Sequence, residues 1–246
     1  MKPWRVIYLG RNLVRRVLLF ILGLTALVHG GPTVVMAASL LVSLAVYALA
    51  FGMNFAVGFV ILLFIHEAGH IGASRAVGVP ASGPVFLPFI GAAMSLEREP
   101  VNARMEANIA IGGPAAGTLS ALVCLAVYFW TDSILMLVLA YTAGLLNLFN
   151  LIPCDPLDGG RIAGAISPHM WWVGSIAIGL LFLYTGNFFI LLVFLFSLFR
   201  LWQGEERENA YYYRLTAEQR LTVLWWYLGL LLVLGATTLY IAEIIR

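Results

Sequence analysis

Long apolar segments with very few charges dominate this chain and restrict what it can fold into. Hydrophobic residues make up 62% of the 246 residues and charged residues only 11%, whereas about a quarter of an ordinary soluble domain is charged. Because a helix that crosses a membrane needs about 20 apolar residues, the chain has room for about six to eight membrane segments joined by short links. We therefore expect an all-α polytopic membrane protein embedded in the lipid bilayer, for which any regulatory module would be a separate membrane protein.

Eight apolar segments follow one another along the sequence. They cover residues 17–29, 33–50, 54–73, 107–130, 133–152, 170–184, 187–202 and 221–241. The first is short for a hydrocarbon core of about 30 Å, so it either tilts into a neighbour or lies at the membrane interface. Since the apolar character resumes after Pro32, we expect this segment to be retained and not cleaved as a signal peptide.

Basic residues are distributed unequally between the loops. If the seven later segments cross the membrane and the first does not, thirteen of the fourteen lysines and arginines lie on one side, and Arg246 is the exception. The positive-inside rule then makes that side cytoplasmic. This orientation places the end of segment 54–73 nearer the cytoplasmic face, and we expect the protein in the cell membrane. The scattered arginines and a net charge of +2 argue against a nucleic-acid partner.

The strongest functional signal is His66-Glu67-Ala68-Gly69-His70, near the end of an apolar segment. Residues four apart lie on one face of a helix, so both imidazoles can bind one metal ion while Glu67 remains free to move a proton. Ionisable residues at bilayer depth are costly and are functional by default. The motif therefore predicts a hydrolytic zinc centre inside a membrane; the alternative is a pair of structural histidines at a polar helix end.

Two histidines leave such a site incomplete, because catalytic zinc normally has three protein ligands and a water molecule. Asp132 lies in a predicted turn far from the histidines, and Asp155 precedes a proline, which favours an extended or turn conformation and at most an indirect role. Asp158 is the best candidate, because Gly159 and Gly160 behind it let the backbone turn and approach a metal closely.

Two motifs make the sequence similar to a known family. The first runs from His66 to His70, and the second is Asn-x-x-Pro-x-x-Pro-Leu-Asp-Gly-Gly at residues 150–160. Together with the spacing between them, they resemble the site-2 protease family of intramembrane zinc metalloproteases. The resemblance covers residues 54–165, the three-helix catalytic core of that family.

The resemblance carries residue roles with it. It implies one Zn²⁺ ion per chain with three ligands, His66, His70 and Asp158. It also implies that Glu67 activates the water and that Asn150 and Pro156 help to hold the substrate. The chain departs from the family pattern at Cys154 and Asp155, which replace a usually less polar pair and put an extra acidic group near the metal.

The stretch between the two motifs, at about 78–101, is apolar but interrupted by prolines and glycines. Irregular backbone at membrane depth must be buried in protein or line a wet cavity, so we expect a re-entrant loop or a short hairpin beside the metal. An ordinary interfacial connector is the alternative. Such a segment could pair with a locally unwound substrate as an added strand, and Phe86 and Phe89 are its predicted substrate contacts.

We divide the chain into five parts. These are an N-terminal basic segment with the first membrane helices (1–53), a catalytic membrane core (54–165), accessory membrane helices (166–203), a cytoplasmic linker (204–220) and a C-terminal membrane helix (221–246). The last part of the core is expected to be a helix that carries the motif at 150–160. Asn147 lies one helical turn before this motif, where it either joins the polar site or makes a helix-to-helix hydrogen bond.

The predicted function is that of an intramembrane zinc endopeptidase that cuts the transmembrane segment of another membrane protein and so releases a cytoplasmic fragment. The alternative is a proteolytically inactive membrane scaffold or transporter-like protein with a structural zinc site. Glu67 discriminates between them, because a structural site closes its fourth coordination position and has no use for a free carboxylate beside the ligands. A zinc carrier is disfavoured, since the sequence lacks the further paired ligands of a transport path.

Overall fold

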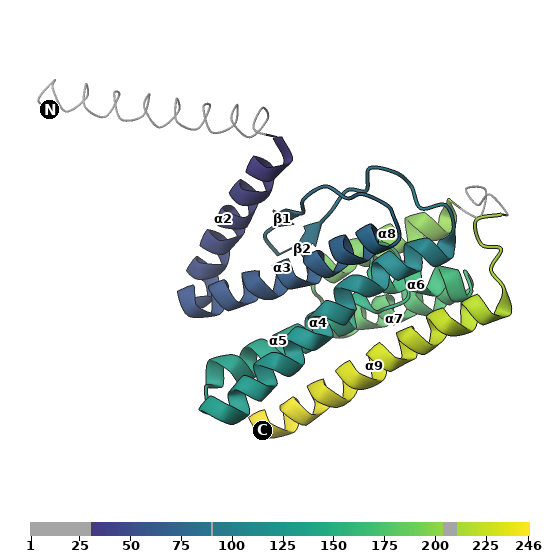
Figure 1. Ribbon diagram of the computed structural model, residues 1–246. Helices are drawn as coiled ribbons and strands as arrows, with labels where there is room; N and C mark the ends of the chain where they lie inside the picture. The colour runs from purple at the N-terminus through teal and green to yellow at the C-terminus, as the bar shows by residue number, and fades with distance from the viewer. Residues whose placement is uncertain (1–30, 90, 204–210) are drawn as a thin grey trace, which may run out of the picture.

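The structure, a computed structural model, describes residues 31–89, 91–203 and 211–246. Its elements are α2 (Gly31–Phe51), α3 (Met53–Ala76), β1 (Val85–Leu87), β2 (Gly91–Ala93), α4 (Ala103–Thr131), α5 (Ile134–Asn150), α6 (Asp158–Ile166), α7 (Met170–Thr185), α8 (Phe188–Trp202) and α9 (Ala217–Ile245) (Figure 1). The predicted segment 17–29, the basic residues before it and the linker residues 204–210 lie outside the described residues. Whether segment 17–29 crosses the membrane therefore stays a prediction.

Among the described residues, helices α2, α3, α4 and α9 are long and apolar enough to cross a membrane. The apolar helices α5, α7 and α8 are shorter, at 17, 16 and 15 residues. Their lengths correspond to about 23–26 Å, less than a hydrocarbon core of about 30 Å. The chain is an integral membrane protein built from helices, as predicted, whereas a count of six to eight membrane segments stays a prediction.

Helix α4 lies at the centre of the bundle and packs against α3, α5, α6 and α9 (Figure 1). Its start is fixed by Asn102, whose side-chain oxygen accepts a hydrogen bond of 2.9 Å from the amide of Met105 and so satisfies a donor that a helix start leaves free. Glycines bring α4 close to α3, since a Cβ added at Gly112 would overlap the backbone of Gly69, and the reverse also holds. The helix with both histidines is therefore held backbone to backbone against α4.

The stretch at 78–101 forms a short hairpin, one of the two predicted forms. β1 and β2 pair antiparallel with Phe86 opposite Ala92, and a further bridge joins Ala81 to Leu96. The hairpin packs on α2 and α3, and its anchor is the side chain of Phe86, which is buried in a cluster with Tyr47. This packing satisfies the requirement that irregular backbone at membrane depth be covered by protein.

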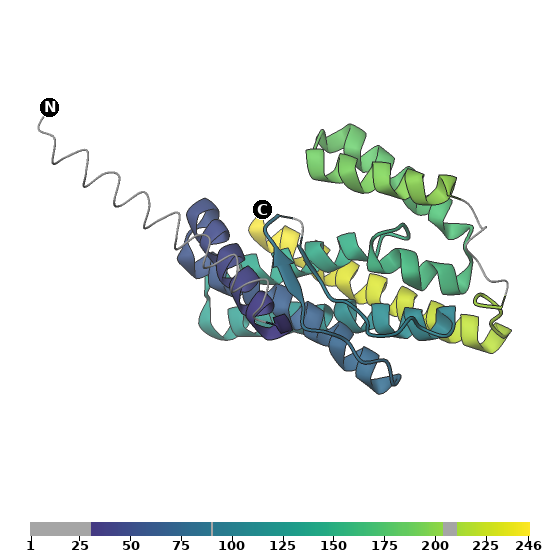
Figure 2. The same cartoon turned by 90° about the horizontal axis from the view of Figure 1, so that it is seen from above.

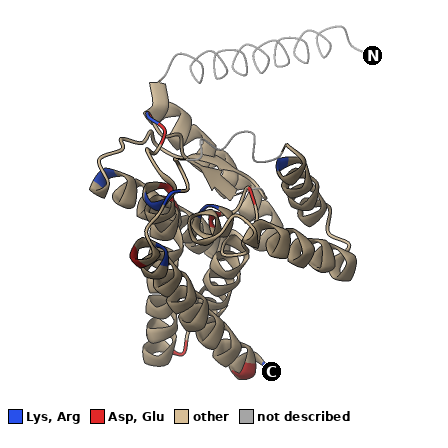
Figure 3. Ribbon diagram, turned by 90° about the vertical axis from the view of Figure 1, so that its right-hand side faces the viewer, with Lys and Arg blue, Asp and Glu red and all other residues tan. Residues whose placement is uncertain are grey.

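Basic residues gather at one end of the bundle. Arg75 and Arg200 lie in the last turns of α3 and α8, and Arg104 and Arg220 lie in the first turns of α4 and α9. Figure 3 looks onto this end, which is the right-hand end in Figure 1, whereas the α4–α5 turn and the C-terminus lie at the opposite end. The described residues therefore show the charge asymmetry that the sequence predicted. Which end faces the cytoplasm stays a prediction.

Candidate metal centre

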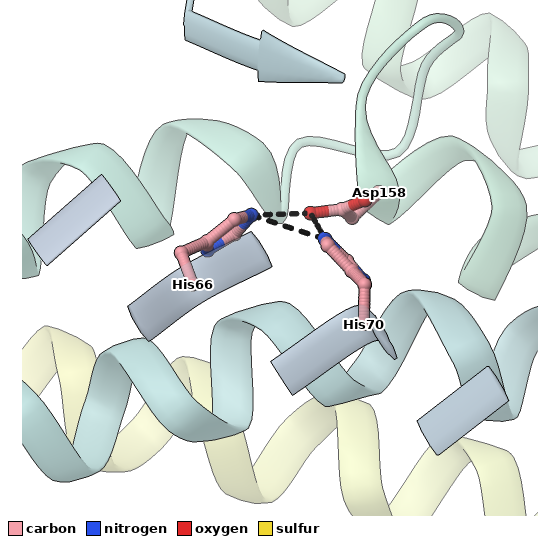
Figure 4. A group of neighbouring side chains, drawn as sticks. All are labelled: His66, His70 and Asp158. Atoms are coloured by element: carbon pink, nitrogen blue, oxygen red, sulfur yellow. Dashed lines mark hydrogen bonds and ion pairs between the residues drawn. The ribbon is translucent and has the colours of Figure 1, made fainter. Parts of the chain in front are cut away.

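Three potential metal ligands converge from two elements that lie far apart in the sequence. His66 and His70 project from α3, and Asp158 is the first residue of α6 (Figure 4). Oδ2 of Asp158 lies 3.2 Å from Nε2 of His66 and 3.3 Å from Nε2 of His70, and the two Nε2 atoms are 3.1 Å apart. All three side chains are largely shielded from solvent. The structure thus brings together the residues that the sequence predicted as ligands.

The spacing of these three atoms suits a tetrahedral metal ion. Zinc binds imidazole nitrogen and carboxylate oxygen at about 2.0–2.2 Å, so neighbouring corners of its tetrahedron stand about 3.3–3.5 Å apart. The observed separations of 3.1–3.3 Å are close to this edge. Among the described residues, His66, His70 and Asp158 form the complete group, which leaves a fourth position for water, as catalytic zinc requires. The residues present therefore fit a zinc ion.

Each imidazole is oriented through its other nitrogen. Nδ1 of His66 lies 2.8 Å from Oδ1 of Asn147 on α5, and Nδ1 of His70 lies 2.9 Å from the carbonyl oxygen of Ile109 on α4. The amide oxygen of Asn147 only accepts, so Nδ1 of His66 carries the proton and its Nε2 presents a lone pair toward Asp158. Nδ1 of His70 faces the Ile109 carbonyl, which accepts, and also the amide of Gly113 at 3.3 Å, which donates. The shorter contact with Ile109 favours a proton on this nitrogen as well. Of the two roles that the sequence left open for Asn147, membership of the polar site is the one found.

Glycines on α4 create the space that these side chains occupy. A Cβ added at Gly113 would overlap the rings of His70 and His66, and a Cβ added at Gly117 would overlap the amide group of Asn147. These positions therefore have a local reason to lack a side chain, in addition to the close packing of α3 and α4.

Asp158 reaches the site from a turn and not from a continuous helix, which corrects one prediction. Helix α5 ends at Asn150, residues 151–157 form turns, and α6 begins at Asp158. The two glycines that follow also act differently from expectation. A Cβ at Gly159 would overlap the carbonyl of Leu151, and a Cβ at Gly160 would overlap the backbone at Cys154, so the glycines let α6 pack onto its own preceding turn.

The other aspartates point to different partners. Oδ2 of Asp155 accepts a hydrogen bond of 2.8 Å from Nε of Arg200 on α8, so the extra acidic group that departs from the family pattern is neutralised by an arginine. Asp132 caps the far end of α4 in the left-handed conformation, with φ 52°. Neither residue belongs to the metal-binding group.

Glu67 lies between the two histidines in the sequence of α3 and is only 5% exposed. Among the described residues its carboxylate makes no hydrogen bond or ion pair with a side chain or the backbone, whereas the neighbouring imidazoles are each bonded at Nδ1. The carboxylate oxygens are nevertheless not fully enclosed, so a water molecule can reach them. Such a group beside three convergent ligands is suited to proton transfer.

The predicted substrate contacts fall into two groups. Pro156 is exposed, Asn150 is partly buried, and Phe89 is 49% exposed, with its ring stacked on Phe189 of α8 at a centroid distance of 6.4 Å. Phe86 is only 1% exposed and packs into the hydrophobic cluster under the hairpin. The Phe86 side chain faces the α2–α3 core, and its contact with substrate stays a prediction.

Comparison with known proteins finds similarity to a curated protein and to solved structures. A zinc metalloprotease of Methanocaldococcus jannaschii is 40% identical over 115 residues, a match that covers 43% of this chain and 33% of that protein. A solved site-2 protease, also from Methanocaldococcus jannaschii, aligns with a TM-score of 0.46 and 24% identity, covering 72% of this chain and 87% of that one. No family model matches the chain.

The chain resembles the site-2 protease family. The histidine motif, the aspartate motif and a relative named as a zinc metalloprotease support this assignment. The matched stretch spans about a third of that relative. The activity, substrates and partners of this chain are therefore proposals, which rest on the residues of its own site.

Proposed function

We propose that the chain is an intramembrane zinc endopeptidase of the site-2 type, which hydrolyses a peptide bond in or near the transmembrane segment of another membrane protein. The observation that carries the proposal is the position of Glu67, whose largely buried side chain makes no hydrogen bond among the described residues and lies on the membrane helix that bears His66 and His70. A purely structural zinc site would fill its fourth position and would need no such carboxylate. The inactive scaffold is the weaker alternative for this reason.

The chemistry divides between the metal and Glu67. A zinc ion held by His66, His70 and Asp158 would polarise the peptide carbonyl and lower the pKa of a water molecule toward neutrality. Glu67 takes a proton from the water whose oxygen attacks the carbonyl carbon, and it delivers that proton to the amine nitrogen as the carbon–nitrogen bond breaks. One water is consumed, and one carboxyl end and one amine end are formed.

The four predicted substrate contacts remain part of the proposal, and among them Phe86 is held in the hydrophobic cluster under the hairpin. Asn150 ends α5 just before the turn to Asp158, and Pro156 and Phe89 present exposed surface. A peptide bond in a helix is shielded by its own hydrogen bonds, so the substrate must unwind locally before attack. The two-stranded β1–β2 sheet offers backbone edges to which an unwound segment could add as a strand.

We place the site nearer the cytoplasmic face of the cell membrane. His70 lies six residues before the end of α3 at Ala76, which is about 9 Å along the helix axis, and the arginine-rich end follows directly. Reporter fusions after residues 132, 161, 210 and 246 test the orientation. A cytoplasmic signal at 132 or 246 would reverse it. The proposed parts of the chain remain the core at 54–165, its accessory helices at 166–203 and the linker at 204–220.

The decisive experiment compares Glu67→Gln with Glu97→Gln. Both replace a carboxylate by an amide, but Glu97 is exposed on the loop after the hairpin. Each variant is co-expressed with candidate single-span membrane proteins, and the purified chain is analysed for zinc. We expect Glu67→Gln to retain zinc and to lose the cleavage fragments, and Glu97→Gln to behave like the wild type. Unchanged cleavage by Glu67→Gln would refute the proposed role of this carboxylate.

A further inference from the structure

Asn147 is an unusual residue for its position, because it is an amide in the last turn of an apolar helix and is 1% exposed. Burying an unbonded amide costs about 1–3 kcal/mol by protein measurements, and a leucine at this position would avoid that cost. Both ends of the amide are bonded instead. Nδ2 donates to the carbonyl oxygen of Ala143 at 2.8 Å, and Oδ1 faces Nδ1 of His66 at 2.8 Å.

These two bonds fix the orientation of the amide and the tautomer of the histidine. A backbone carbonyl can only accept, so the group that faces Ala143 is the NH₂ and the group that faces His66 is the oxygen. An amide oxygen also only accepts, so Nδ1 of His66 must donate. Nε2 of His66 is then unprotonated and presents its lone pair toward Oδ2 of Asp158, 3.2 Å away.

The two histidines are held by partners of different kinds. His70 uses the backbone carbonyl of Ile109, which no side-chain substitution removes. His66 depends on the Asn147 side chain, which in turn depends on the absence of a side chain at Gly117, because a Cβ there would overlap the Asn147 amide. Hydrogen-bond partners of metal-binding histidines fix ring orientation and tautomer and raise the basicity of the ligand nitrogen.

We infer that Asn147 is a positioning residue that sets the tautomer and ring orientation of His66 for metal binding, and that Gly117 is the position that makes room for it. The inference rests on the proposed function, because it assumes that His66, His70 and Asp158 bind zinc. It adds two residues outside both sequence motifs to the machinery of the site.

The test measures the zinc dissociation constant of the purified full chain in detergent, by competition with a chromogenic chelator. Asn147→Leu keeps the size of the side chain but removes the acceptor, and we expect a loss of affinity of about 10- to 100-fold. Asn147→Asp keeps an acceptor for His66 but loses the donor to Ala143, so it should lose less affinity than Asn147→Leu does. Asn54→Leu is the matched control, because Asn54 is exposed in the first turn of α3, and it should leave affinity unchanged.

A second set of variants tests the roles of Asn147 and Gly117 even if Asn147→Leu does not fold. Gly117→Ala should lower zinc affinity on its own, because its methyl group displaces the amide of Asn147. In an Asn147→Ala background the displaced group is absent, so the same substitution should have no further effect. Additive losses would mean that Gly117 acts through general packing and would overturn the assignment.

The outcomes separate the two proposals. A wild-type chain that binds no zinc would refute the proposed function, together with the inference that rests on it. Wild-type zinc binding with equal affinity in Asn147→Leu would leave the proposed function intact and would refute the role of Asn147. An equal loss of affinity in Asn147→Leu and Asn147→Asp would show that the hydrogen-bond acceptor does not matter, and would also count against the inference.

Discussion

Helices α4 and α8 are both strongly apolar, but different kinds of contact hold them in the molecule. α4 has buried residues along its whole length and is surrounded by α3, α5, α6 and α9. The described residues of α8 include one buried residue, Ser197, which bonds to Ser175 of α7, while many of its large apolar side chains are exposed. Figure 2 shows α7 and α8 standing beside the remainder of the bundle.

This difference separates two kinds of residue. Some fix the geometry of the bundle through contacts with particular partners, and others only make a helix surface apolar enough to lie in lipid. At the centre, glycines and buried polar groups meet specific partners, as Gly69 meets Gly112 and Asn147 meets His66. On α8, apolar side chains need only an apolar solvent, which the bilayer supplies. The turn before Asp158 contacts both the central bundle and the α7–α8 pair. The Leu151 carbonyl accepts a hydrogen bond from Tyr227 of α9, and Cys154 packs with Ile178 of α7.

The largest expected effect contrasts two aspartates on that turn. Asp158→Ala removes one of three ligands of the central site, so stable zinc binding should be lost, as should also happen in His66→Ala and His70→Ala. Asp155→Ala removes a carboxylate that faces α8, and zinc content should remain at about one ion per chain. Metal analysis of the purified variants checks this. Full zinc content in Asp158→Ala would show that the convergence at the centre is not a metal site.

The next effect contrasts two phenylalanines of the hairpin. Phe86→Asp places an unpaired carboxylate in the buried cluster under β1, so we expect it to destabilise the fold by several kcal/mol. Phe89→Asp alters an exposed side chain and should preserve zinc content and thermal stability while slowing cleavage. Thermal unfolding in detergent and zinc analysis separate the two. Equal stability of both variants would contradict the burial of Phe86.

A smaller effect is expected at two glycines of the central helices. Gly112→Ala forces a methyl group against the backbone of Gly69 and should destabilise by about 1–3 kcal/mol, as overpacking does. Gly72→Ala on α3 meets open space, so its better helix propensity should stabilise by up to about 1 kcal/mol. Unfolding in a denaturing detergent measures both changes. A neutral Gly112→Ala would mean that α3 and α4 are not held backbone to backbone.

Much of the metal centre could be predicted from the sequence, because its rules are local. The spacing of His66 and His70 follows from the helical period, and the choice of Asp158 over Asp155 follows from its neighbours. The contact of Asn147 with His66 was left open, since it depends on how α5 is rotated against α3. That rotation is set by packing through Gly117 and not by any local pattern.

Two features of the fold could not be predicted from the sequence, because they too depend on how the elements pack. α6 carries three glycines in nine residues, a composition that disfavours a helix by propensity. It forms because Ile162 and Ala163 are buried against the core and tertiary packing overrides propensity. Phe86 and Phe89 looked equivalent in the sequence, but Phe86 lies in β1 and packs onto the core, whereas Phe89 lies in the turn after the strand with φ 63°.

The smallest expected effect concerns the ion pair between Asp155 and Arg200, which joins the ligand-bearing turn to α8. The Arg200 side chain is 41% exposed, and exposed pairs contribute only about 0.2–1 kcal/mol. A double-mutant cycle with Asp155→Asn and Arg200→Gln, read as unfolding free energy, should therefore give a coupling within that range, while zinc affinity stays at the wild-type value in all four chains. A coupling of several kcal/mol, or a loss of zinc in Arg200→Gln, would mean that α8 helps to hold Asp158 in place. Helix α8 would then belong to the same rigid unit as the centre.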